Sequence, residues 1–262
     1  MLDVHVLGRV FNEHFNAKPQ AVVRAPGRVN LIGEHTDYNE GFVLPMAIDR
    51  GIWIALRPRR DRRVHVVSED FGSSASFDLS ALRKGEGWIE YVKGVAHELI
   101  EAGYPVRGWE GVMMGDVPRG AGLSSSAALE LATARAFASV SDFEWDPAGM
   151  ASLAQRAENG WVGVMCGIMD QMASAASIAG HALFLDCRTL EIQHVPLPSE
   201  ASVVVLDTST RRGLVGSAYN ERRAQCEAAA RFFGVRALRD VSVEEFERRS
   251  GGMKDETVMR RA

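Results

Sequence analysis

The architecture of this chain can be inferred first from residues 116–130, which read Asp-Val-Pro-Arg-Gly-Ala-Gly-Leu-Ser-Ser-Ser-Ala-Ala-Leu-Glu. They follow an apolar stretch, 109–115, with the composition of a β-strand, and they lead into a predicted helix at 127–139. Gly120 and Gly122 can adopt positive φ and let a ligand approach the backbone closely. The serines that follow stand where a helix exposes unpaired N–H groups and favours an anion. This strand–loop–helix unit is therefore predicted to bind phosphate.

A glycine turn followed by an ordinary serine N-cap is the plainer interpretation of the same loop. One side chain is enough to cap a helix, however, and here Ser124, Ser125 and Ser126 follow one another. The loop lacks the Gly-Lys-Ser/Thr ending of a P-loop, and it does not match the dinucleotide fingerprint. Phosphate binding is the favoured interpretation, and the residues by themselves do not identify the molecule that carries the phosphate.

Hydrophobic patterning predicts strands and helices on both sides of this loop. Strands are predicted at 20–24, 63–68, 76–79, 181–186 and 202–207, with two more inside 41–57 that meet at a bend near 49–51. Helices are predicted at the N-terminus and at 88–102, 147–159, 168–179 and 216–233. Asp146 and Pro147 have the residue types of an N-cap and a first helical position. Two prolines interrupt the pattern between 189 and 200, where we predict a domain boundary.

Composition restricts the classes of partner. The 262 residues include 30 Lys and Arg against 34 Asp and Glu, which gives a net charge of −4 without global attraction for nucleic acid or an anionic membrane. Cys166, Cys187 and Cys226 form no CxxC pair, as expected for reduced thiols in the cytosol. The N-terminal 15 residues indicate an amphipathic helix and not a signal peptide, and no apolar run approaches the ~20 residues that span a bilayer. We therefore expect a soluble, cytoplasmic monomer.

Two further stretches carry a resemblance to a known family. Residues 24–39 read Arg-Ala-Pro-Gly-Arg-Val-Asn-Leu-Ile-Gly-Glu-His-Thr-Asp-Tyr-Asn and resemble the galactokinase signature almost letter for letter. Residues 166–171, Cys-Gly-Ile-Met-Asp-Gln, are similar to the galactokinase segment with the catalytic aspartate. Residues 117–126 resemble a motif shared by the wider superfamily of galactokinases, homoserine kinases, mevalonate kinases and phosphomevalonate kinases. The similarity continues through 219–226 and so covers essentially the whole chain.

The resemblance implies an α+β fold with two domains. Residues 1–190 would form an N-terminal domain for sugar and ATP, related to domain 2 of ribosomal protein S5, and the order of predicted elements is compatible with this. Residues 191–262 would be an incomplete part of a ferredoxin-like C-terminal domain. Family members are longer and carry a third, glycine-rich motif near the C-terminus, and nothing after Met253 resembles it. The chain therefore looks truncated relative to the family.

The resemblance also assigns the sugar site. Sugar contacts fall on Glu34, His35, Thr36, Asp37, Gly167, Asp170 and Tyr219. Carboxylates such as Glu34 and Asp37 accept hydrogen bonds from pairs of hydroxyls, which suits a hexose. Asp170 corresponds to the catalytic base that takes the proton of the C1 hydroxyl, and Arg28 to an arginine near both Asp170 and the γ-phosphate. Without the resemblance, a polar surface turn and a helix-capping aspartate would be equally reasonable.

The nucleotide and metal sites are assigned in the same way. ATP contacts fall on Ser68 and on Gly120, Ala121, Gly122, Leu123, Ser124, Ser125 and Ser126, with Trp88 beside the adenine. Glu158 and Ser126 correspond to the protein ligands of Mg²⁺. One carboxylate and one hydroxyl, completed by ATP oxygens and water, make the sparse shell typical of a nucleotide-bound Mg²⁺.

The resulting hypothesis is a galactokinase, which transfers the γ-phosphoryl group of ATP to the C1 hydroxyl of D-galactose and gives galactose 1-phosphate and ADP. Two alternatives remain at this stage. The chain could be a sensor that binds galactose and ATP without catalysis, or an inactive truncated kinase. It could also be a kinase for a related sugar such as N-acetylgalactosamine or arabinose.

Overall fold

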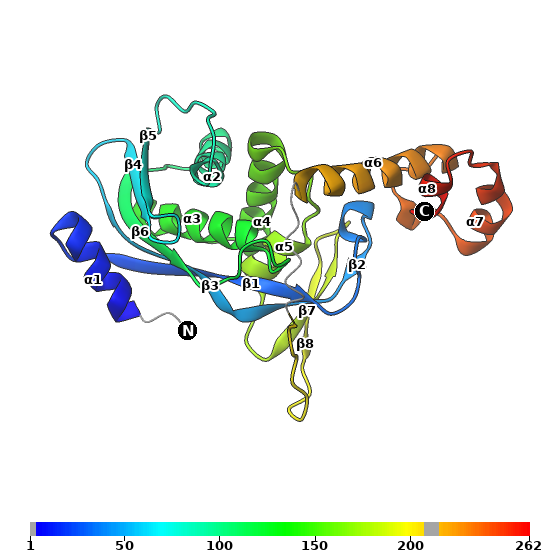
Figure 1. Ribbon diagram of the computed structural model, residues 1–262, viewed down its shortest axis with the longest axis horizontal. Coiled ribbons are helices and arrows are strands. Elements are labelled where there is room, and N and C mark those ends of the chain that lie inside the picture. Colours follow the sequence, from blue (N-terminus) through cyan, green and yellow to red (C-terminus); the bar gives the residue numbers. More distant parts are fainter. Residues whose placement is uncertain (1–3, 207–214) are drawn as a thin grey trace.

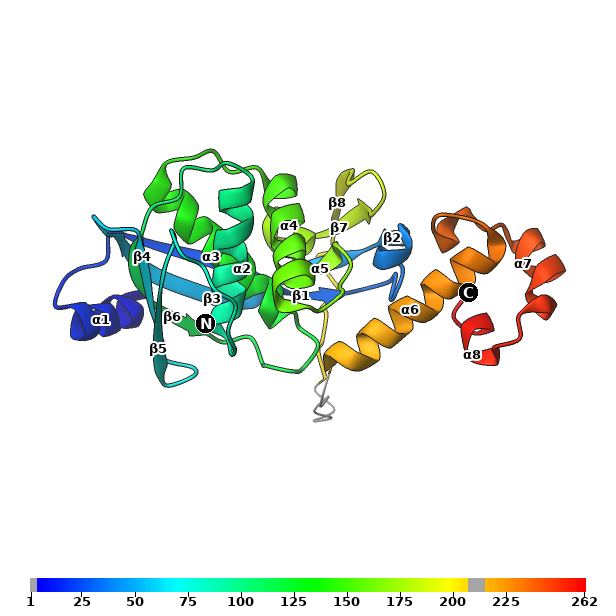
Figure 2. The ribbon, with the colours of Figure 1, turned by 90° about the horizontal axis from the view of Figure 1, so that it is seen from above.

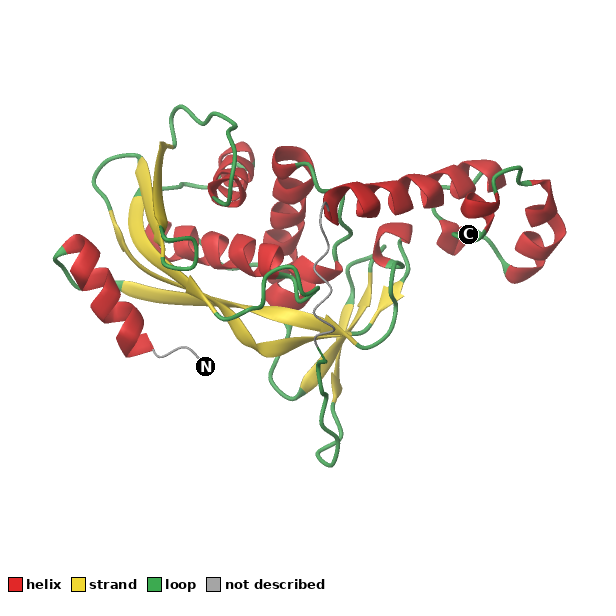
Figure 3. Cartoon of the chain, in the orientation of Figure 1, coloured by secondary structure: helices red, strands yellow, loops and turns green. Residues whose placement is uncertain are grey.

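The computed structural model describes residues 4–206 and 215–262 and has an α+β fold (Figures 1 and 3). A five-stranded sheet forms its centre. The strands in spatial order are β1 (Ala21–Asn30), β3 (Pro45–Pro58), β6 (Trp109–Gly115), β4 (Arg63–Ser68) and β5 (Ser73–Asp78). All neighbours pair antiparallel except β4 and β6, which are parallel. The strands predicted at 63–68 and 109–115 are confirmed with the same bounds.

Helices cover both faces of this sheet, because apolar side chains alternate between the two faces along its strands. In β3, Trp53 and Ala55 face α1 (Val4–Phe15), which packs Leu7 and Phe11 against them. Burial of two such side chains contributes about 1.5–3 kcal/mol each. The opposite face carries the larger core and lies under α2 (Ile89–Glu101), α3 (Ser125–Ser141), α4 (Pro147–Arg156) and α5 (Met169–Ala176) (Figure 1).

α3 is the central helix of the larger layer. It is buried on almost every side, since it packs against β1, β3, α2, α4 and α5. Its many alanines allow this close approach of neighbouring elements. α4 begins as predicted: the Asp146 carboxylate accepts hydrogen bonds from the N–H groups of Ala148 and Gly149 at 3.2 and 3.1 Å. A π-helical segment, η2 (Ala157–Val162), continues directly from α4.

A small second sheet extends the molecule toward the C-terminal helices. Its strands are β2 (Phe42–Val43), β7 (His181–Asp186) and β8 (Ile192–Pro196), in the order β2–β7–β8. Beyond it, α6 (Val215–Phe233) projects away from the main body and carries the remaining helices (Figure 2). Those helices are η3 (Leu238–Asp240), α7 (Val243–Arg249), η4 (Ser250–Gly252) and α8 (Glu256–Met259). Across the described ranges, no helix is long and apolar enough to cross a membrane.

Three sequence predictions were wrong in detail. The strand predicted at 202–207 is not present in 202–206, and Asp207 lies outside the described residues. In the described part of the chain, residues 202–206 pair with no strand, and the Leu206 side chain is 83% exposed. The two strands in 41–57 separate at Leu44 and not near 49–51. β8 was not predicted because Pro196, its last residue, and Pro198 after it resemble a linker. The domain boundary at 190/191 stays a prediction.

Candidate active site

Arg28 and Asp170 are the centre of the candidate site, although 142 residues separate them along the chain. Asp170 lies in the first turn of α5, and its Oδ1 accepts hydrogen bonds from Arg28 Nε at 2.7 Å and Nη2 at 2.5 Å. The Ser124 hydroxyl donates to the other oxygen, Oδ2. A charge-assisted pair of this kind fixes the direction of the carboxylate.

The same arginine joins Asp170 to residues 119–126, here called the glycine–serine loop. Arg28 Nη1 donates to the Gly122 carbonyl at 2.7 Å, and the Arg28 backbone N–H donates to the Leu123 carbonyl at 3.2 Å. A β-bulge in β1 precedes Arg28, and at Gly27 a Cβ atom would lie 2.7 Å from the Leu123 carbonyl oxygen. Only glycine allows β1 and the loop to approach this closely.

The glycine–serine loop has a backbone suited to an anion. Gly120, Gly122 and Ser124 all have left-handed φ values, of 69°, 75° and 56°. For Ser124 this conformation is strained, and its bond to Asp170 compensates for the strain. Ser124 is the N-cap of α3 without using its side chain for the cap. The first N–H groups of a 17-residue helix therefore have no serine oxygen as acceptor and remain suited to a phosphate.

A cavity of about 390 Å³ adjoins this loop and is lined by Ser125, Ser126 and aromatic side chains. The rings of Phe71 and Trp88 stack with centroids 5.8 Å apart and planes 9° apart, and Tyr91 also lines the cavity. Trp88 thus lines this cavity, and its place beside the adenine stays a prediction. Phe71 and Tyr91 were not singled out from the sequence, because a single aromatic residue in a loop or helix has no distinctive pattern. Ser68 is fully buried and is not among the residues that line the cavity.

The predicted sugar residues lie on the other side of Asp170. Asp37, in the short helix η1 (Asp37–Asn39), is only 8% exposed. Burial and then the nearby Asp170 raise its pKa to about 6 against the opposing hydrogen bonds from backbone N–H groups. At Gly167 a Cβ atom would lie 2.1 Å from Asp37 Oδ2, so this position accepts no side chain while Asp37 keeps its place.

Tyr219, on α6, lies beside the segment that contains Asp37. Its ring centroid lies 5.5 Å from that of Tyr38 and 6.2 Å from that of His35. Burial, together with Asp37 and Asp170, raises the pKa of the Tyr219 phenol well above its usual value, so the phenol stays protonated and can donate.

Glu34 and Thr36 already have partners within the loop. A Glu34 oxygen accepts from Asn30 Nδ2 at 2.8 Å. The Thr36 hydroxyl lies near the carbonyls of Gly33 and Phe42, at 2.8 and 2.7 Å, and fastens the turn.

A second carboxylate cluster lies beneath the glycine–serine loop. Glu158 in η2 is 5% exposed, and Glu130 in α3 is fully buried. Gln171 Nε2 donates to both carboxylates, at 2.7 Å to Glu158 and 3.1 Å to Glu130. The thiol of Cys166 and the hydroxyl of Ser126 also bond to Glu158. Burial raises the pKa of both carboxyl groups, because desolvation disfavours their charged form. Among the described residues, neither carboxyl group forms an ion pair with a lysine or arginine that would oppose this rise.

Glu130 and Gln171 were not predicted as site residues. Glu130 is the last residue of the quoted stretch and lies in α3, where most of its neighbours along the helix are alanine or leucine. That unusual position for a carboxylate was the available signal. The structure thus brings together Arg28, Asp170 and the loop on one side of the α3 N-terminus, and Ser126, Glu158 and Glu130 below it.

Comparison with known proteins shows which families the chain resembles. Residues 9–58 match the family model described as the galactokinase galactose-binding signature, and residues 90–177 match the GHMP kinases N terminal domain. The chain is 48% identical over 251 residues to a galactokinase of a Roseiflexus species and 47% identical over 248 residues to one of Chloroflexus aurantiacus. These matches cover 94% and 92% of this chain. The chain spans 64% of the length of each of these relatives.

Solved structures agree with the sequence comparison. The chain is similar to the Lactococcus lactis galactokinase complexed with galactose, with a TM-score of 0.89 and 35% identity over 98% of this chain and 69% of that one. It is also similar to the mevalonate kinase of Methanococcus jannaschii, with a TM-score of 0.56 at 19% identity over 69% of this chain and 56% of that one, which supports the shared fold alone.

Proposed function

The chain belongs to the galactokinase family, and from this premise we propose that it transfers the γ-phosphoryl group of ATP to the C1 hydroxyl of D-galactose. The observation that carries the proposal is the Arg28–Asp170 pair. Its arginine contacts the loop at the α3 N-terminus, and its aspartate interacts electrostatically with the buried Asp37. A hydroxyl group and a phosphate that bind on its two sides would meet at Asp170.

In the proposed reaction Asp170 is the general base. Its carboxylate takes the proton of the C1 hydroxyl while that oxygen forms a bond to the γ-phosphorus. The bond between the γ-phosphorus and the β,γ-bridging oxygen breaks, and ADP leaves with the electron pair. Arg28 fixes the direction of the Asp170 carboxylate, and the permanent charge of Arg28 lies close to the loop that would hold the phosphates. Asp37 and Tyr219 would orient the sugar through its other hydroxyls.

The residues around Glu158 suit Mg²⁺. Two buried carboxylates lie close together without a cationic side chain in the described part of the chain, and the Glu130 Oε1 atom has no hydrogen-bond partner there. Such a cluster is costly unless a cation balances it. We propose that Glu158 and Ser126 hold Mg²⁺ when ATP is bound, and that Mg²⁺ then neutralises charge on the phosphate oxygens.

We further propose that the base of ATP lies in the cavity of about 390 Å³, against Trp88 and Phe71. Aromatic side chains give a flat base a large apolar contact surface. The cavity borders Ser125 and Ser126, so a nucleotide held there would direct its phosphates at the α3 N-terminus. Ser68 would support this cavity from within the core and not touch the nucleotide, because it is fully buried.

A second candidate function is binding of galactose and ATP without turnover. The groups that would hold the two ligands, Asp37 and the loop at the α3 N-terminus, serve such binding whether or not transfer follows. The catalytic groups Arg28, Asp170, Glu158 and Ser126 are all present, which favours the kinase. A coupled assay of ADP release with galactose, ATP and Mg²⁺ separates the two functions.

For a galactokinase, ADP release should depend on galactose and be lost in the Asp170→Asn variant. Calorimetric binding of both ligands with ADP release no higher than in Asp170→Asn would contradict the kinase and support the sensor. Arabinose and N-acetylgalactosamine belong in the same assay, and equal turnover of either would contradict galactose as the preferred substrate.

A further inference from the structure

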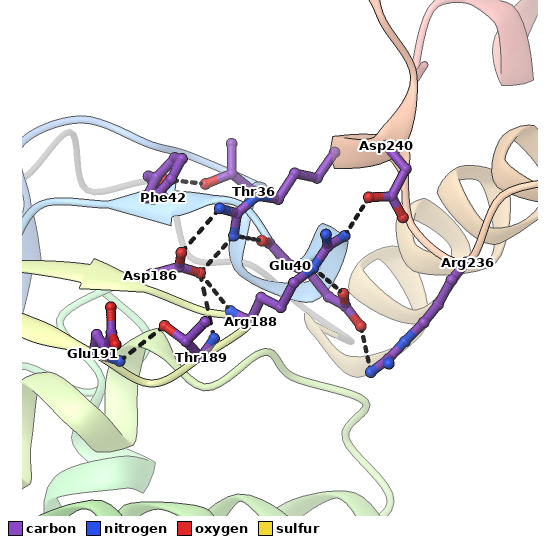
Figure 4. Close-up of polar contacts among 10 residues, drawn as sticks. Thr36, Glu40, Phe42, Asp186, Arg188, Thr189, Glu191, Arg236 and Asp240 are labelled. Carbon is purple, nitrogen blue, oxygen red and sulfur yellow. Dashed lines mark hydrogen bonds and ion pairs between the residues drawn. The ribbon is translucent and has the colours of Figure 1, made fainter.

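A cluster of paired charges lies outside the reacting centre and joins three separate parts of the chain (Figure 4). It contains three carboxylates and three guanidinium groups, which we call the arginine clamp: Glu40, Asp186, Asp240, Arg188, Arg236 and Arg239. Glu40 follows η1, Asp186 and Arg188 belong to the end of β7 and its turn, and the other three lie just after α6 or in η3.

Glu40 is the point where the three parts meet. Its Oε2 lies 2.7 Å from Arg188 Nε, and its Oε1 lies 2.7 Å from Arg236 Nη2. Its backbone carbonyl accepts a hydrogen bond from Arg239 Nη1 at 2.8 Å. The Glu40 side chain is 19% exposed, and its backbone has a left-handed φ of 59°. A strained residue with three arginine contacts is held from several directions at once.

Asp186 and Arg239 make the strongest pair of the clamp. Two parallel hydrogen bonds of 2.5 and 2.9 Å join them, and the Arg239 guanidinium also lies 4.2 Å from the ring centroid of Phe42. Hydrogen bonding to Arg239 lowers the pKa of Asp186 to about 2, so the pair stays charged at physiological pH. Arg188 Nη2 completes the network with a 2.6 Å contact to Asp240.

The clamp connects the two segments that would form the sugar pocket in the proposed function, the segment with Asp37 and the helix with Tyr219. The segment Thr36–Phe42 contains both Asp37 and Glu40, whereas Arg236 and Arg239 follow the helix that carries Tyr219. Tyr219 meets the same segment through the ring of Tyr38, at 5.5 Å. The position of Tyr219 over Asp37 therefore depends on how firmly the segment and the C-terminal helices are held together.

We propose that Glu40 is a positioning residue that closes the sugar pocket through the arginine clamp and sets galactose affinity without touching the sugar. The proposal rests on the proposed function for its ligand. Single ion pairs at a surface contribute little to stability, but several pairs that share residues and include a bidentate arginine act together. Because part of each pair is exposed, salt should weaken the clamp.

The test compares Glu40→Gln with a matched control, Glu98→Gln. Glu98 forms a long-range pair with Arg156 at 2.8 Å and has a side chain 16% exposed, but it lies on α2, away from the sugar segment. Calorimetry should show galactose Kd about tenfold higher in Glu40→Gln and within about twofold of wild type in Glu98→Gln. The Kd of Mg·ADP should not change in either variant. Glu40→Asp, which keeps the charge, should recover part of the galactose affinity.

Salt and hydrogen exchange give two further measurements. Raising NaCl from about 50 to about 500 mM should weaken galactose binding to wild type and leave that of Glu40→Gln nearly unchanged. Amide exchange of residues 36–42 should become faster in Glu40→Gln and not in Glu98→Gln.

The outcomes separate the clamp from the proposed function. Unchanged galactose affinity and unchanged exchange at 36–42 in Glu40→Gln would overturn the clamp. If wild type binds no galactose, the proposed function fails, and exchange at 36–42 alone then supports or overturns the clamp. An equal loss of galactose and Mg·ADP affinity would indicate general damage and also overturn the positioning role.

Discussion

The two carboxylate clusters beside the glycine–serine loop differ in how their negative charge is balanced. Asp170 has a permanent partner, since Arg28 contacts it at 2.5 and 2.7 Å. Glu158 and Glu130 are more deeply buried, and the described part of the chain offers them only an amide, a thiol and a hydroxyl. The protein therefore supplies the positive charge beside its proposed base, whereas under the proposed function the cation of the second cluster would come from outside the protein.

The two clusters therefore differ in whether a ligand is needed to balance their charge. The Arg28–Asp170 pair is complete before any ligand arrives, so its cost in free energy is already met on folding. The Glu158–Glu130 cluster is unfavourable when both groups are charged, and binding of Mg²⁺ with ATP would relieve it. Four predictions can break or sharpen this comparison.

The largest effect is expected at Asp170. The Asp170→Asn variant keeps the shape of the side chain but cannot accept the C1 proton, so turnover should fall roughly a thousandfold or more. Galactose and Mg·ATP should still bind, because the loop and Asp37 are unaffected. Steady-state ADP release measures the first quantity, and calorimetry measures the second. Turnover within tenfold of wild type would exclude Asp170 as the base.

The next effect is expected at Gly167. In Gly167→Ala the new methyl group would lie 2.1 Å from Asp37 Oδ2, so the buried carboxylate must move out of place. Galactose affinity should fall by about a hundredfold, as expected when a buried polar contact is lost, whereas Mg·ADP affinity should hold. Gly160→Ala is the control, because a Cβ there meets no atom within 4 Å. Retained galactose binding in Gly167→Ala would separate Asp37 from the sugar site.

The comparison itself is tested by two neutral substitutions with opposite expected signs. Without Mg²⁺, Glu158→Gln should raise the free energy of unfolding by roughly 1–3 kcal/mol, because it removes an unbalanced buried charge. Glu110→Gln should lower it, since Glu110 is similarly buried but pairs with Arg57 and Arg59. Urea unfolding at pH 7.5 with a chelator measures both.

Measuring the same variants with Mg·ADP completes this test. The stabilisation of wild type by Mg·ADP should be lost in Glu158→Gln and kept in Glu110→Gln. A loss of stability in metal-free Glu158→Gln, equal to that in Glu110→Gln, would show that both clusters are balanced by the protein alone.

The smallest effect concerns pH. Because the pKa of Asp37 is raised to about 6, galactose affinity should fall about tenfold per pH unit below that value as the carboxylate becomes protonated. The same shift makes folding stability from this group greatest below its unfolded pKa, 3.8, and lost as pH rises through 6.

A matched substitution isolates this contribution. The Asp37→Asn variant should therefore be more stable than wild type at pH 7.5, by about 3 kcal/mol at most, and should show no such pH dependence. Equal pH profiles of stability for the two proteins would assign the effect to another group.

Several features of the fold were predictable because they depend on local sequence. The strands at 63–68 and 109–115 and the Asp146 cap follow from alternation and capping chemistry, which act over a few residues. The strand predicted at 202–207 failed because a strand also needs a neighbour, and no local pattern supplies one. β8 was missed for the opposite reason: its pairing with β7 outweighs the prolines around it.

The sequence by itself determined the kinds of chemistry available to this protein: a glycine–serine loop for phosphate, carboxylates for hydroxyl groups, and the family to which these belong. Only the tertiary structure decided which groups meet. The contacts of Arg28 with Asp170, of Gln171 with Glu130 and of Glu40 with Arg236 join residues that are far apart in the chain or paired across elements. Charge balance and burial depend on three-dimensional neighbours, and that is the physical reason why a sequence pattern could not assign them.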